Sequence, residues 1–476
     1  MKGVYLNTKC DSIIDSGMIE CTSLRLQEFS IGESSVRYFS HQNKDCCAFL
    51  DAHVVLFHGW AFTDKLIDAN EFYTLYKNNE LGTINAGNFI AIISHDNNID
   101  IINDPFGLST HYYRFTENSI EIAPTTSAFD NKILDEQLAR FENQQGHLVG
   151  NYTRFKDIKR LPPGSVVNHT GKVKVYTSLI AESPQPISYV RKEMGHLIES
   201  YPYKLRVAPL TGGFDSRLIA STSTFSYGYT YGAPTNIDTL IGKQITSTTA
   251  CYFQFELDAE NKVDIEADKY IFDANVSNAF TIYRQISNAL AEQSKEVSTC
   301  TVYDGYLGDG LQRASYLKLG GVLGGLFLLF PILYRLPLSA KYILKRRYRH
   351  LDAINTEFLI NEFAKVTSQL NLTPYQNIIY FESLYGRGGR YIINGGNIAA
   401  GQFFTVVSPF AHKNVFNALL KQDFKDVVSY KNMSNLWSGA SSAFTNLATE
   451  SGIKPNTPYL LAPFLRVFNS IKQKIS

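Results

Sequence analysis

The chain lacks a strong net charge, cysteines at redox or metal-binding spacing, and an apolar segment long enough to cross a bilayer. Its formal net charge is +1, so no field over the whole molecule favours nucleic acid. The six cysteines form no CxxC pair, and a chain of 476 residues can fold without disulfides, so we expect free thiols in a reducing compartment. The first residues contain no apolar segment typical of a signal peptide, which predicts a cytoplasmic protein.

The most apolar segment runs from Val322 to Tyr334 and is interrupted by Pro331. It is shorter than the roughly 20 residues that a membrane-spanning helix needs. A basic segment follows at Lys345–Arg349. One interpretation is a buried helix with a solvated basic end. The other is a patch over residues 320–350 that rests on the inner face of a membrane, or on a membrane-bound partner.

A change of pattern along the chain predicts two domains, 1–180 and 187–476, joined by the Pro-containing segment 181–186. The first is expected to be mainly β, with strands over 48–57, 88–94, 98–102 and 165–167. In the second, strands (205–210, 228–231, 253–257) alternate with helices (187–200, from 217 onward, 237–252). This alternation predicts a parallel, doubly wound α/β sheet, followed by a mainly helical region from about residue 351.

The strongest local motif is Leu210-Thr211-Gly212-Gly213-Phe214-Asp215-Ser216, between a predicted strand and a predicted helix. Ligands of open α/β sheets bind beyond the carboxyl ends of the strands. Adjacent glycines let backbone N–H groups approach phosphate oxygens, and Ser216 adds a hydroxyl donor. Asp215 would repel a bare phosphate, so its presence points to Mg²⁺ between carboxylate and phosphates. Ser216 has no obvious histidine partner in the sequence, so we do not expect a hydrolase triad.

A second glycine-rich segment, Asp304-Gly305-Tyr306-Leu307-Gly308-Asp309-Gly310, follows the predicted strand at 301–303. A segment with so few bulky side chains suits close contact with a polyanion, and Asp309 is the candidate for a second carboxylate on the metal. Taken alone, it is also compatible with an ordinary turn.

Together these motifs resemble the asparagine synthetase family. Thr211–Ser216 is similar to its SGGxDS pyrophosphate loop, and Gly305–Gly310 is similar to its second loop, GxGxDE. Further segments occur in the family's order: Gly87–Phe89, Asp104–Gly107, Leu161–Gly164, Gly232–Lys243 and Ser408–His412. The resemblance implies an N-terminal αββα domain of the Ntn-hydrolase (glutaminase) type and a C-terminal ATP-pyrophosphatase domain.

The family binds ATP, adenylates a carboxylate and transfers it to an amine to form an amide. The resemblance therefore implies ATP and Mg²⁺ as cofactors, with Asp215 and Asp309 as metal ligands. The implied ATP and pyrophosphate contacts are Leu210, Thr211, Gly212, Gly213, Asp215, Ser216, Gly232 and Gly305.

The chain departs from the family pattern at several positions. Lys2 replaces the cysteine that follows the initiator methionine in active glutaminases, and Cys10 is not terminal, so we expect no glutamine hydrolysis. Tyr306 stands where asparagine-forming members carry Glu, which resembles the β-lactam and carbapenam synthetases. There a Tyr paired with a Glu helps to deprotonate the amine, and Glu382 is the candidate partner here. Gly310 and His412 replace the family's Glu and Asp, which leaves catalytic competence open.

Other candidate residues are weaker. Lys454, or alternatively Lys431, would stabilise charge in the transition state, although the usual sequence context is absent. Arg387 and Arg390, with Asn394, lie among glycines and could hold a carboxylate or phosphate, or form a basic loop that is solvated or paired within the protein.

We therefore expect a carbon–nitrogen ligase that joins a carboxylate to ammonia or an amino group. The carboxylate could be a sugar uronic acid in surface-polysaccharide assembly, a peptide side chain or a small β-amino acid. Two alternatives remain: a non-catalytic nucleotide-binding scaffold, and an asparagine synthetase that uses free ammonia. The sequence does not specify the oligomeric state.

Overall fold

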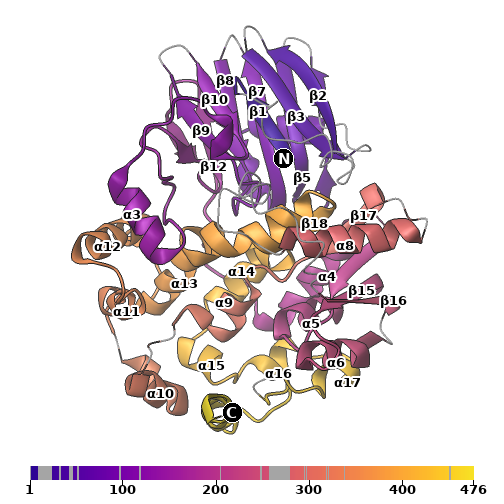
Figure 1. Ribbon diagram of the computed structural model, residues 1–476, viewed down its shortest axis with the longest axis vertical. Coiled ribbons are helices and arrows are strands. Elements are labelled where there is room, and N and C mark those ends of the chain that lie inside the picture. Colours follow the sequence, from indigo (N-terminus) through magenta and orange to yellow (C-terminus); the bar gives the residue numbers. More distant parts are fainter. Residues whose placement is uncertain are drawn as a thin grey trace. The chain divides into compact units, whose positions relative to one another are not determined.

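The structure is a computed structural model, and it describes residues 2–8, 24–31, 34–41, 47–50, 53–95, 98–116, 119–203, 205–246, 249–256, 279–293, 295, 297–317, 319, 321–336, 338–449 and 452–475. The chain forms two compact units (Figure 1). Unit 1 comprises Met1–Leu179, Leu257–Val302 and Leu384–Val407, and unit 2 comprises Ile180–Glu256, Tyr303–Ser383 and Ser408–Ser476. The predicted linker at 181–186 lies just after the first change of unit, but two later segments return to unit 1.

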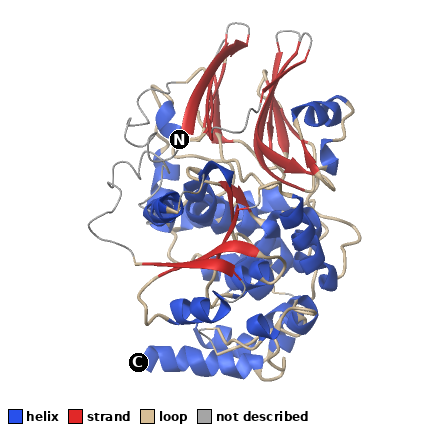
Figure 2. Cartoon of the chain, turned by 90° about the vertical axis from the view of Figure 1, so that its right-hand side faces the viewer, coloured by secondary structure: helices blue, strands red, loops and turns tan. Residues whose placement is uncertain are grey.

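Unit 1 contains two antiparallel sheets, which Figure 2 shows as two layers of strands. The first has the order β11-β9-β10-β1-β3-β2: Lys159–Arg160, Tyr112–Phe115, Ile120–Ala123, Gly3–Leu6, Ser34–His41 and Leu24–Ile31. The second has the order β13-β12-β8-β7-β5-β4: Val173–Val175, Ser165–Asn168, Asn98–Asn103, Ala86–His95, His53–Phe62 and Cys47–Leu50. A short strand β6 (Leu66–Ile67) pairs with β5.

Alternating apolar side chains from both sheets meet in one core. Val4 and Val36 of the first sheet pack in the same cluster as Leu56, Ile90 and Ile92 of the second, and all five are fully buried. This is the arrangement that period-2 patterning produces when each sheet turns its apolar face inward.

The outer face of the second sheet is covered by helix α2 (Ala69–Lys77), which a capping box at Asp68 begins. Phe72 of this helix stacks on Phe57 at 4.7 Å between ring centroids. The other long helices of unit 1 are α3 (Glu136–Gln145) and α8 (Ala279–Glu292). Its short helical turns are η1 (Leu81–Thr83), η2 (Thr126–Ala128), η5 (Val297–Thr299), and the π-helical η8 (Gly388–Ile392) and η9 (Asn394–Ala399).

Unit 2 contains the parallel strands β14 (Leu205–Pro209), β15 (Phe225–Tyr231) and β16 (Thr249–Phe255), in the order β16-β15-β14. Helices α4 (Val190–Ser200), α5 (Phe214–Ala220) and α6 (Ile237–Ile245) alternate with them, and η3 (Ile187–Tyr189) precedes α4. The expected mixed α/β class with a parallel sheet is therefore confirmed. The remaining strands are β17 (Cys300–Tyr303) and β18 (Thr405–Val407).

Helices make up the rest of unit 2. They are α9 (Gly308–Arg313), α10 (Gly321–Leu329), α11 (Ala340–Arg347), α12 (Ala353–Thr367), α13 (Pro374–Leu384), α14 (Lys413–Leu420), α15 (Phe424–Val428), α16 (Met433–Leu436), α17 (Ser442–Thr445) and α18 (Ala462–Ile475), with short turns η6 (Ser315–Leu317), η7 (Pro331–Arg335) and η10 (Pro409–Ala411). In the described part of the chain, no helix has both the length and the apolar character that a membrane crossing requires.

Three of the predicted elements were wrong in detail. The helix predicted over 237–252 ends at Ile245, and Thr249 already begins β16. The strand predicted over 48–57 is two paired strands, β4 and β5, and residues 51–52 between them lie outside the described part. The helix expected from Arg217 begins at Phe214, which moves Asp215 and Ser216 into its first turn.

Candidate functional site

The first glycine loop follows β14, and Gly213 is the N-cap residue of α5. Both glycine N–H groups already have acceptors. The N–H of Gly212 donates to Asp238 Oδ1 at 2.8 Å, and that of Gly213 donates to Thr211 Oγ1 at 3.1 Å. Thr211 and Ser216 also share a hydrogen bond of 2.7 Å between their hydroxyls. A phosphate that used these donors would have to replace Asp238 and Thr211.

Arg217 fixes the shape of this loop. Its fully buried guanidinium donates to the carbonyls of Gly212 at 3.0 Å and Gly213 at 3.2 Å. It also donates to the carbonyls of Phe444 and Leu447, so it ties the loop to the region of α17. Burial lowers the Arg217 pKa to about 10, which leaves the side chain charged at neutral pH. The loop is therefore held in one conformation by a buried cation.

The second glycine loop packs directly on Asp215. A Cβ at Gly308 would lie 2.7 Å from Asp215 Oδ1, and one at Gly305 would lie 3.1 Å from the Asp215 Cβ. Leu307, between them, has a left-handed backbone with φ of 73°. The two motifs that the sequence singled out separately are thus in contact, and the contact depends on glycine at 305 and 308.

The two predicted metal ligands face the same guanidinium. Arg313 Nη2 lies 3.5 Å from Asp215 Oδ2, and the same nitrogen forms an ion pair with Asp309. Gln312 Nε2 donates to Asp215 Oδ1 at 2.7 Å. In this arrangement Arg313 neutralises the charge that a cation between the carboxylates would neutralise.

Electrostatics at Asp215 are unusual. The Asp215 pKa is raised to about 7, mainly by burial; Arg313 opposes the shift, and the negative charges of Asp309 and Asp304 add to it. Burial also raises the Asp304 pKa to about 6. An extra positive charge at this place would relieve a carboxylate that is costly to ionise.

Asp215 and Asp309 fit a Mg²⁺ ion that is bound together with substrate phosphates. Among the described residues, no three histidine, cysteine, aspartate or glutamate side chains gather closely enough to hold a metal by themselves. Mg²⁺ beside substrate phosphates commonly needs only one or two carboxylates, since phosphate oxygens and water complete its shell. Asp215 and Asp309 meet that requirement, but a closed protein cage does not exist here.

The structure gives Tyr306 and Glu382, the predicted pair, the following partners. The Tyr306 hydroxyl donates to the carbonyl of Ser383 at 3.0 Å, one residue beyond Glu382. The Glu382 carboxylate is fully buried and accepts from Arg347 Nε at 2.8 Å and from the Tyr348 hydroxyl at 2.6 Å. Glu382 thus precedes in sequence the residue that Tyr306 contacts, and its carboxylate forms an ion pair with Arg347.

The other predicted residues of unit 2 lie as follows. Gly232 has φ of +131°, a conformation that favours glycine, and its N–H donates to the carbonyl of Phe255 at 2.8 Å. Lys454 is exposed, and its backbone N–H donates to Thr457. Lys431 is exposed and pairs with Asp426 at 3.3 Å. The structure gives neither lysine a direct contact with the two glycine loops.

Arg387, Arg390 and Asn394 belong to unit 1. Arg390 donates to the carbonyls of Gly150 at 3.1 Å and Tyr152 at 2.7 Å, and it therefore anchors the π-helical turns. Arg387 lies over the ring of Tyr391. These contacts are structural, which favours the second of the two interpretations that the sequence left open.

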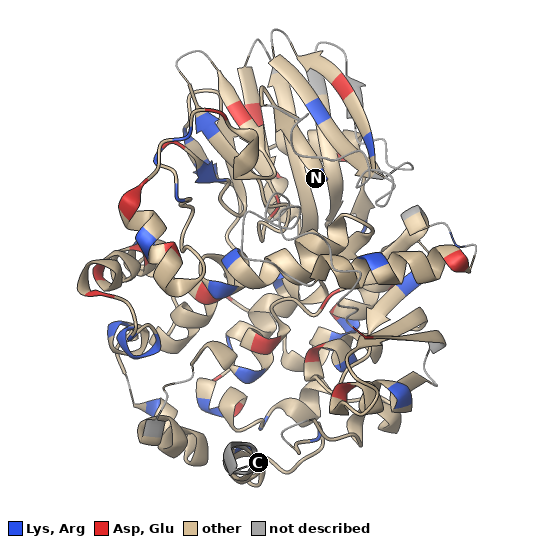
Figure 3. Cartoon of the chain, in the orientation of Figure 1, with Lys and Arg blue, Asp and Glu red and all other residues tan. Residues whose placement is uncertain are grey.

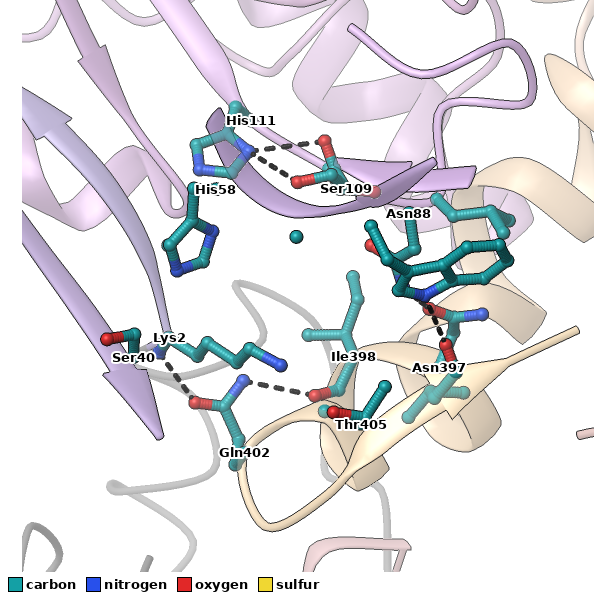
Figure 4. Close-up of a pocket in the computed structure, with 17 residues that line it drawn as sticks. Lys2, Ser40, His58, Asn88, Ser109, His111, Asn397, Ile398, Gln402 and Thr405 are labelled. Carbon is teal, nitrogen blue, oxygen red and sulfur yellow. Dashed lines mark hydrogen bonds between the residues drawn. The ribbon is translucent and has the colours of Figure 1, made fainter. Parts of the chain in front are cut away.

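A pocket lies in unit 1, where β1 begins (Figure 4). It encloses about 70 Å³ of space for water-sized groups, and Lys2, Ser40, His58, Asn88, Ser109, His111 and Gln402 are among its lining residues. The backbone N–H of Lys2 donates to Gln402 Oε1 at 2.8 Å. Lys2 stands where active glutaminases of the resembled family carry their cysteine. Cys10 lies outside the described residues.

Ser109 and His111 in this pocket do not form a nucleophile and base. His111 Nε2 accepts a hydrogen bond from the Val4 N–H at 3.0 Å, so the proton of the neutral ring is on Nδ1. That nitrogen faces the Ser109 carbonyl at 3.2 Å and its hydroxyl at 3.4 Å. Burial lowers the His111 pKa to about 4. The ring nitrogen that faces Ser109 therefore carries the proton and cannot accept the serine proton.

The sequence did not single out several residues of the site. Arg313 and Gln312 contact Asp215, and Asp238 holds the first glycine loop. The spacing of Asp309 and Arg313, four residues apart on a helix, is a signal that could have identified the pair. Lys413 is buried, and its pKa is lowered to about 8 by burial. No sequence pattern indicates that burial.

No protein-family model matches this chain, and no curated protein matches it.

Proposed function

We propose that this protein is an ATP-dependent ligase that activates a carboxylate as an acyl-adenylate and joins it to ammonia or an amino group. On this proposal unit 2 is an ATP-pyrophosphatase domain and unit 1 is an αββα domain of the glutaminase type without its cysteine. The observation that carries the proposal is the contact of the two glycine loops at Asp215, with Asp309 on the same guanidinium.

A pyrophosphate group fits this place by its chemistry. The loops offer N–H and hydroxyl donors at the end of a parallel strand, and glycines at 305 and 308 leave no side chain in the way. Mg²⁺ bound there would neutralise charge on the phosphates. Asp215 and Asp309 would hold it, and Arg313, displaced from between them, would be placed to pair with a phosphate oxygen.

The remaining residues would position the reactants. Arg217 keeps the first loop in shape, and Asp238 releases the Gly212 N–H when an anion competes for it. Tyr306, on the second loop, would contact the attacking amine. Its hydroxyl is now held by the Ser383 carbonyl, which makes it a donor towards an oxygen and not a base.

A nucleotide-binding scaffold is the competing function, and a specific observation favours it. Arg313 already neutralises both carboxylates, and the N–H groups of the first loop are already bonded within the protein. A protein that bound ATP without turning it over could keep both arrangements. The two functions differ in whether pyrophosphate is released.

The test is ATP–pyrophosphate exchange with Mg²⁺ across a panel of carboxylates, including aspartate, uronic acids and acidic peptides. The Asp215→Asn and Asp309→Asn variants should lose at least a hundredfold of the exchange rate, because each removes a metal ligand. Glu357→Gln on α12 is the matched control, since Glu357 is an exposed carboxylate of the same unit.

Exchange that survives in Asp215→Asn would sink the site assignment. ATP binding by calorimetry without exchange for any acid would move the conclusion to the scaffold. Absence of ATP binding would contradict both functions.

A further inference from the structure

Unit 2 exposes an apolar surface that the described part of the chain leaves uncovered. The exposed fractions are 84% for Val322, 51% for Phe330, 67% for Leu460, 57% for Phe464 and 66% for Phe468. We call the surface formed by α10, η7 and the start of α18 the apolar face. It also includes Leu326, Ile332, Leu336 and Leu461, which are each more than two-fifths exposed.

The apolar face is built from segments far apart in sequence. α10 and α18 pack against each other within unit 2, and Figure 1 shows α10 beside the helix at the C-terminal end. Each helix turns out two residues one helical turn apart, Val322 and Leu326 on α10 and Phe464 and Phe468 on α18. Residues at i and i+4 lie on one side of a helix, so each helix presents an apolar stripe.

The face is anchored and is not a loose end of the chain. Phe327 of α10 is buried and packs on Tyr334 of η7, which in turn packs on Phe424 of α15. On α18, Arg466 donates to the carbonyl of Val428 and lies over the ring of Tyr430. Exposure of the stripes is therefore a property of the folded unit.

The segments that form the face carry charge of one sign, although α15, which packs on η7, adds Asp423, beside Arg335, and Asp426. Between Gly310 and Leu351 the sequence has no aspartate or glutamate, but it has Arg313, Lys318, Arg335, Lys341, Lys345, Arg346, Arg347 and Arg349. From Ser451 to the end it again has no acidic residue, and it has Lys454, Arg466, Lys472 and Lys474. Arg335, Lys341, Lys345 and Arg349 are exposed, and Figure 3 shows this part of unit 2 with basic residues on α11.

We propose that the apolar face docks unit 2 onto the surface of an anionic lipid bilayer, with α10 and α18 lying in the plane of the interface. Exposed aromatic and aliphatic stripes beside basic residues are the features that such interfacial helices use. The segments are too short to span, which fits docking and excludes insertion. A second copy of the same face would bring like charges together, which disfavours a dimer through it.

The test is sedimentation of the full chain with vesicles of phosphatidylcholine containing a phosphatidylglycerol fraction, and with phosphatidylcholine alone. The wild type should bind the anionic vesicles and bind the neutral ones at least tenfold more weakly. The Phe464→Ser/Phe468→Ser double variant should lose at least tenfold of the anionic binding. Lys341→Gln/Lys345→Gln should lose binding to anionic vesicles only, by roughly fivefold for each lysine.

The matched control is Ile133→Ser/Val175→Ser in unit 1, whose side chains are 56% and 65% exposed and lie outside the apolar face. It should bind as the wild type does. A wild type that ignores anionic vesicles, or double variants that bind as tightly as the wild type, would overturn the proposal. Self-association of the wild type in gel filtration that the Phe464→Ser/Phe468→Ser variant abolishes would assign the face to a second copy instead.

Discussion

Replacing Asp215 by asparagine should make unit 2 more stable near neutral pH, although the same change should abolish the proposed chemistry. Burial raises the Asp215 pKa to about 7, helped by Asp309 and Asp304, so the folded protein pays to ionise this group. Asparagine keeps the acceptor for Gln312 Nε2, which lies 2.7 Å away, and leaves the Arg313–Asp309 pair intact. The substitution therefore removes the charge and keeps the Gln312 contact, and it gives up only the 3.5 Å contact with Arg313 Nη2.

The size and direction of the effect follow from proton linkage. The pKa rises from the ordinary 3.8 to about 7 on folding, so the folded state binds the proton more tightly. The protonated Asp215 contributes to the free energy of unfolding below about pH 4, and this contribution is lost as pH rises to about 7. A pKa difference of roughly three units corresponds to about 4 kcal/mol. The asparagine variant has no such loss. Its stability advantage over the wild type should grow by that amount between these pH values and then stay constant.

The assay is urea unfolding followed by tryptophan fluorescence at a series of pH values. The chain has two tryptophans, Trp60 in unit 1 and Trp437 in unit 2. Trp437 packs on Phe214, beside Asp215, with ring centroids 6.2 Å apart. A Trp60→Phe background leaves Trp437 as the reporter of unit 2, which avoids treating two units as one transition.

Two results would contradict a raised Asp215 pKa as the cause. A difference between Asp215→Asn and its parent that does not change with pH would mean that burial does not control the Asp215 pKa. A variant that is less stable at every pH would mean that the carboxylate contributes more by its pairing with Arg313 than burial costs. Addition of millimolar Mg²⁺ near pH 8 should stabilise the parent and leave the variant unchanged, if Asp215 binds the metal.

Three further predictions rest on single contacts. Gly308→Ala should reduce ATP–pyrophosphate exchange at least tenfold, because its Cβ would lie 2.7 Å from Asp215 Oδ1, whereas Gly325→Ala, whose Cβ meets nothing within 4 Å, should leave exchange unchanged. Glu382→Gln should lower the free energy of unfolding of unit 2 by about 3 kcal/mol in the same fluorescence assay, since Arg347 would lose its buried partner; an unchanged midpoint would contradict this. His111→Asn should remove a loss of unit 1 stability that the wild type shows as pH falls from about 6.5 to about 4, since the folded pKa is lowered to about 4, and His169→Asn, an exposed control, should not.

The alternation of strands and helices after residue 187 could be predicted because each element carries its own periodicity. The end of α6 could not, because Thr249–Tyr252 continues an apolar pattern that suits either a helix or a strand. Pairing with β15 decides it, and that pairing is not local: Cys251 lies opposite Tyr227. Similarly, Pro331 predicted an interruption of the apolar segment, and it separates α10 from η7.

The contents of the candidate site could be predicted in part. Glycines and aspartates are close together in sequence within 212–215 and again within 305–309, which the sequence shows. The fold brings these two loops into contact. The state of Glu382 could not be predicted, because its partner Arg347 is 35 residues away on another helix. Hydropathy suggested burial for 322–334, but burial depends on what else packs there. Phe327 and Tyr334 are covered, whereas Val322 and Phe330 are exposed.

The central claim is that the paired glycine loops of unit 2 support adenylation of a carboxylate. Its most direct measurement is Mg²⁺-dependent release of pyrophosphate and AMP from ATP in the presence of each candidate acid, with wild type, Asp215→Asn and Glu357→Gln compared. We expect stoichiometric AMP and pyrophosphate with at least one acid for the wild type and Glu357→Gln, and none for Asp215→Asn. Equal release by Asp215→Asn, or ATP bound by the wild type but never cleaved with any acid, would contradict it.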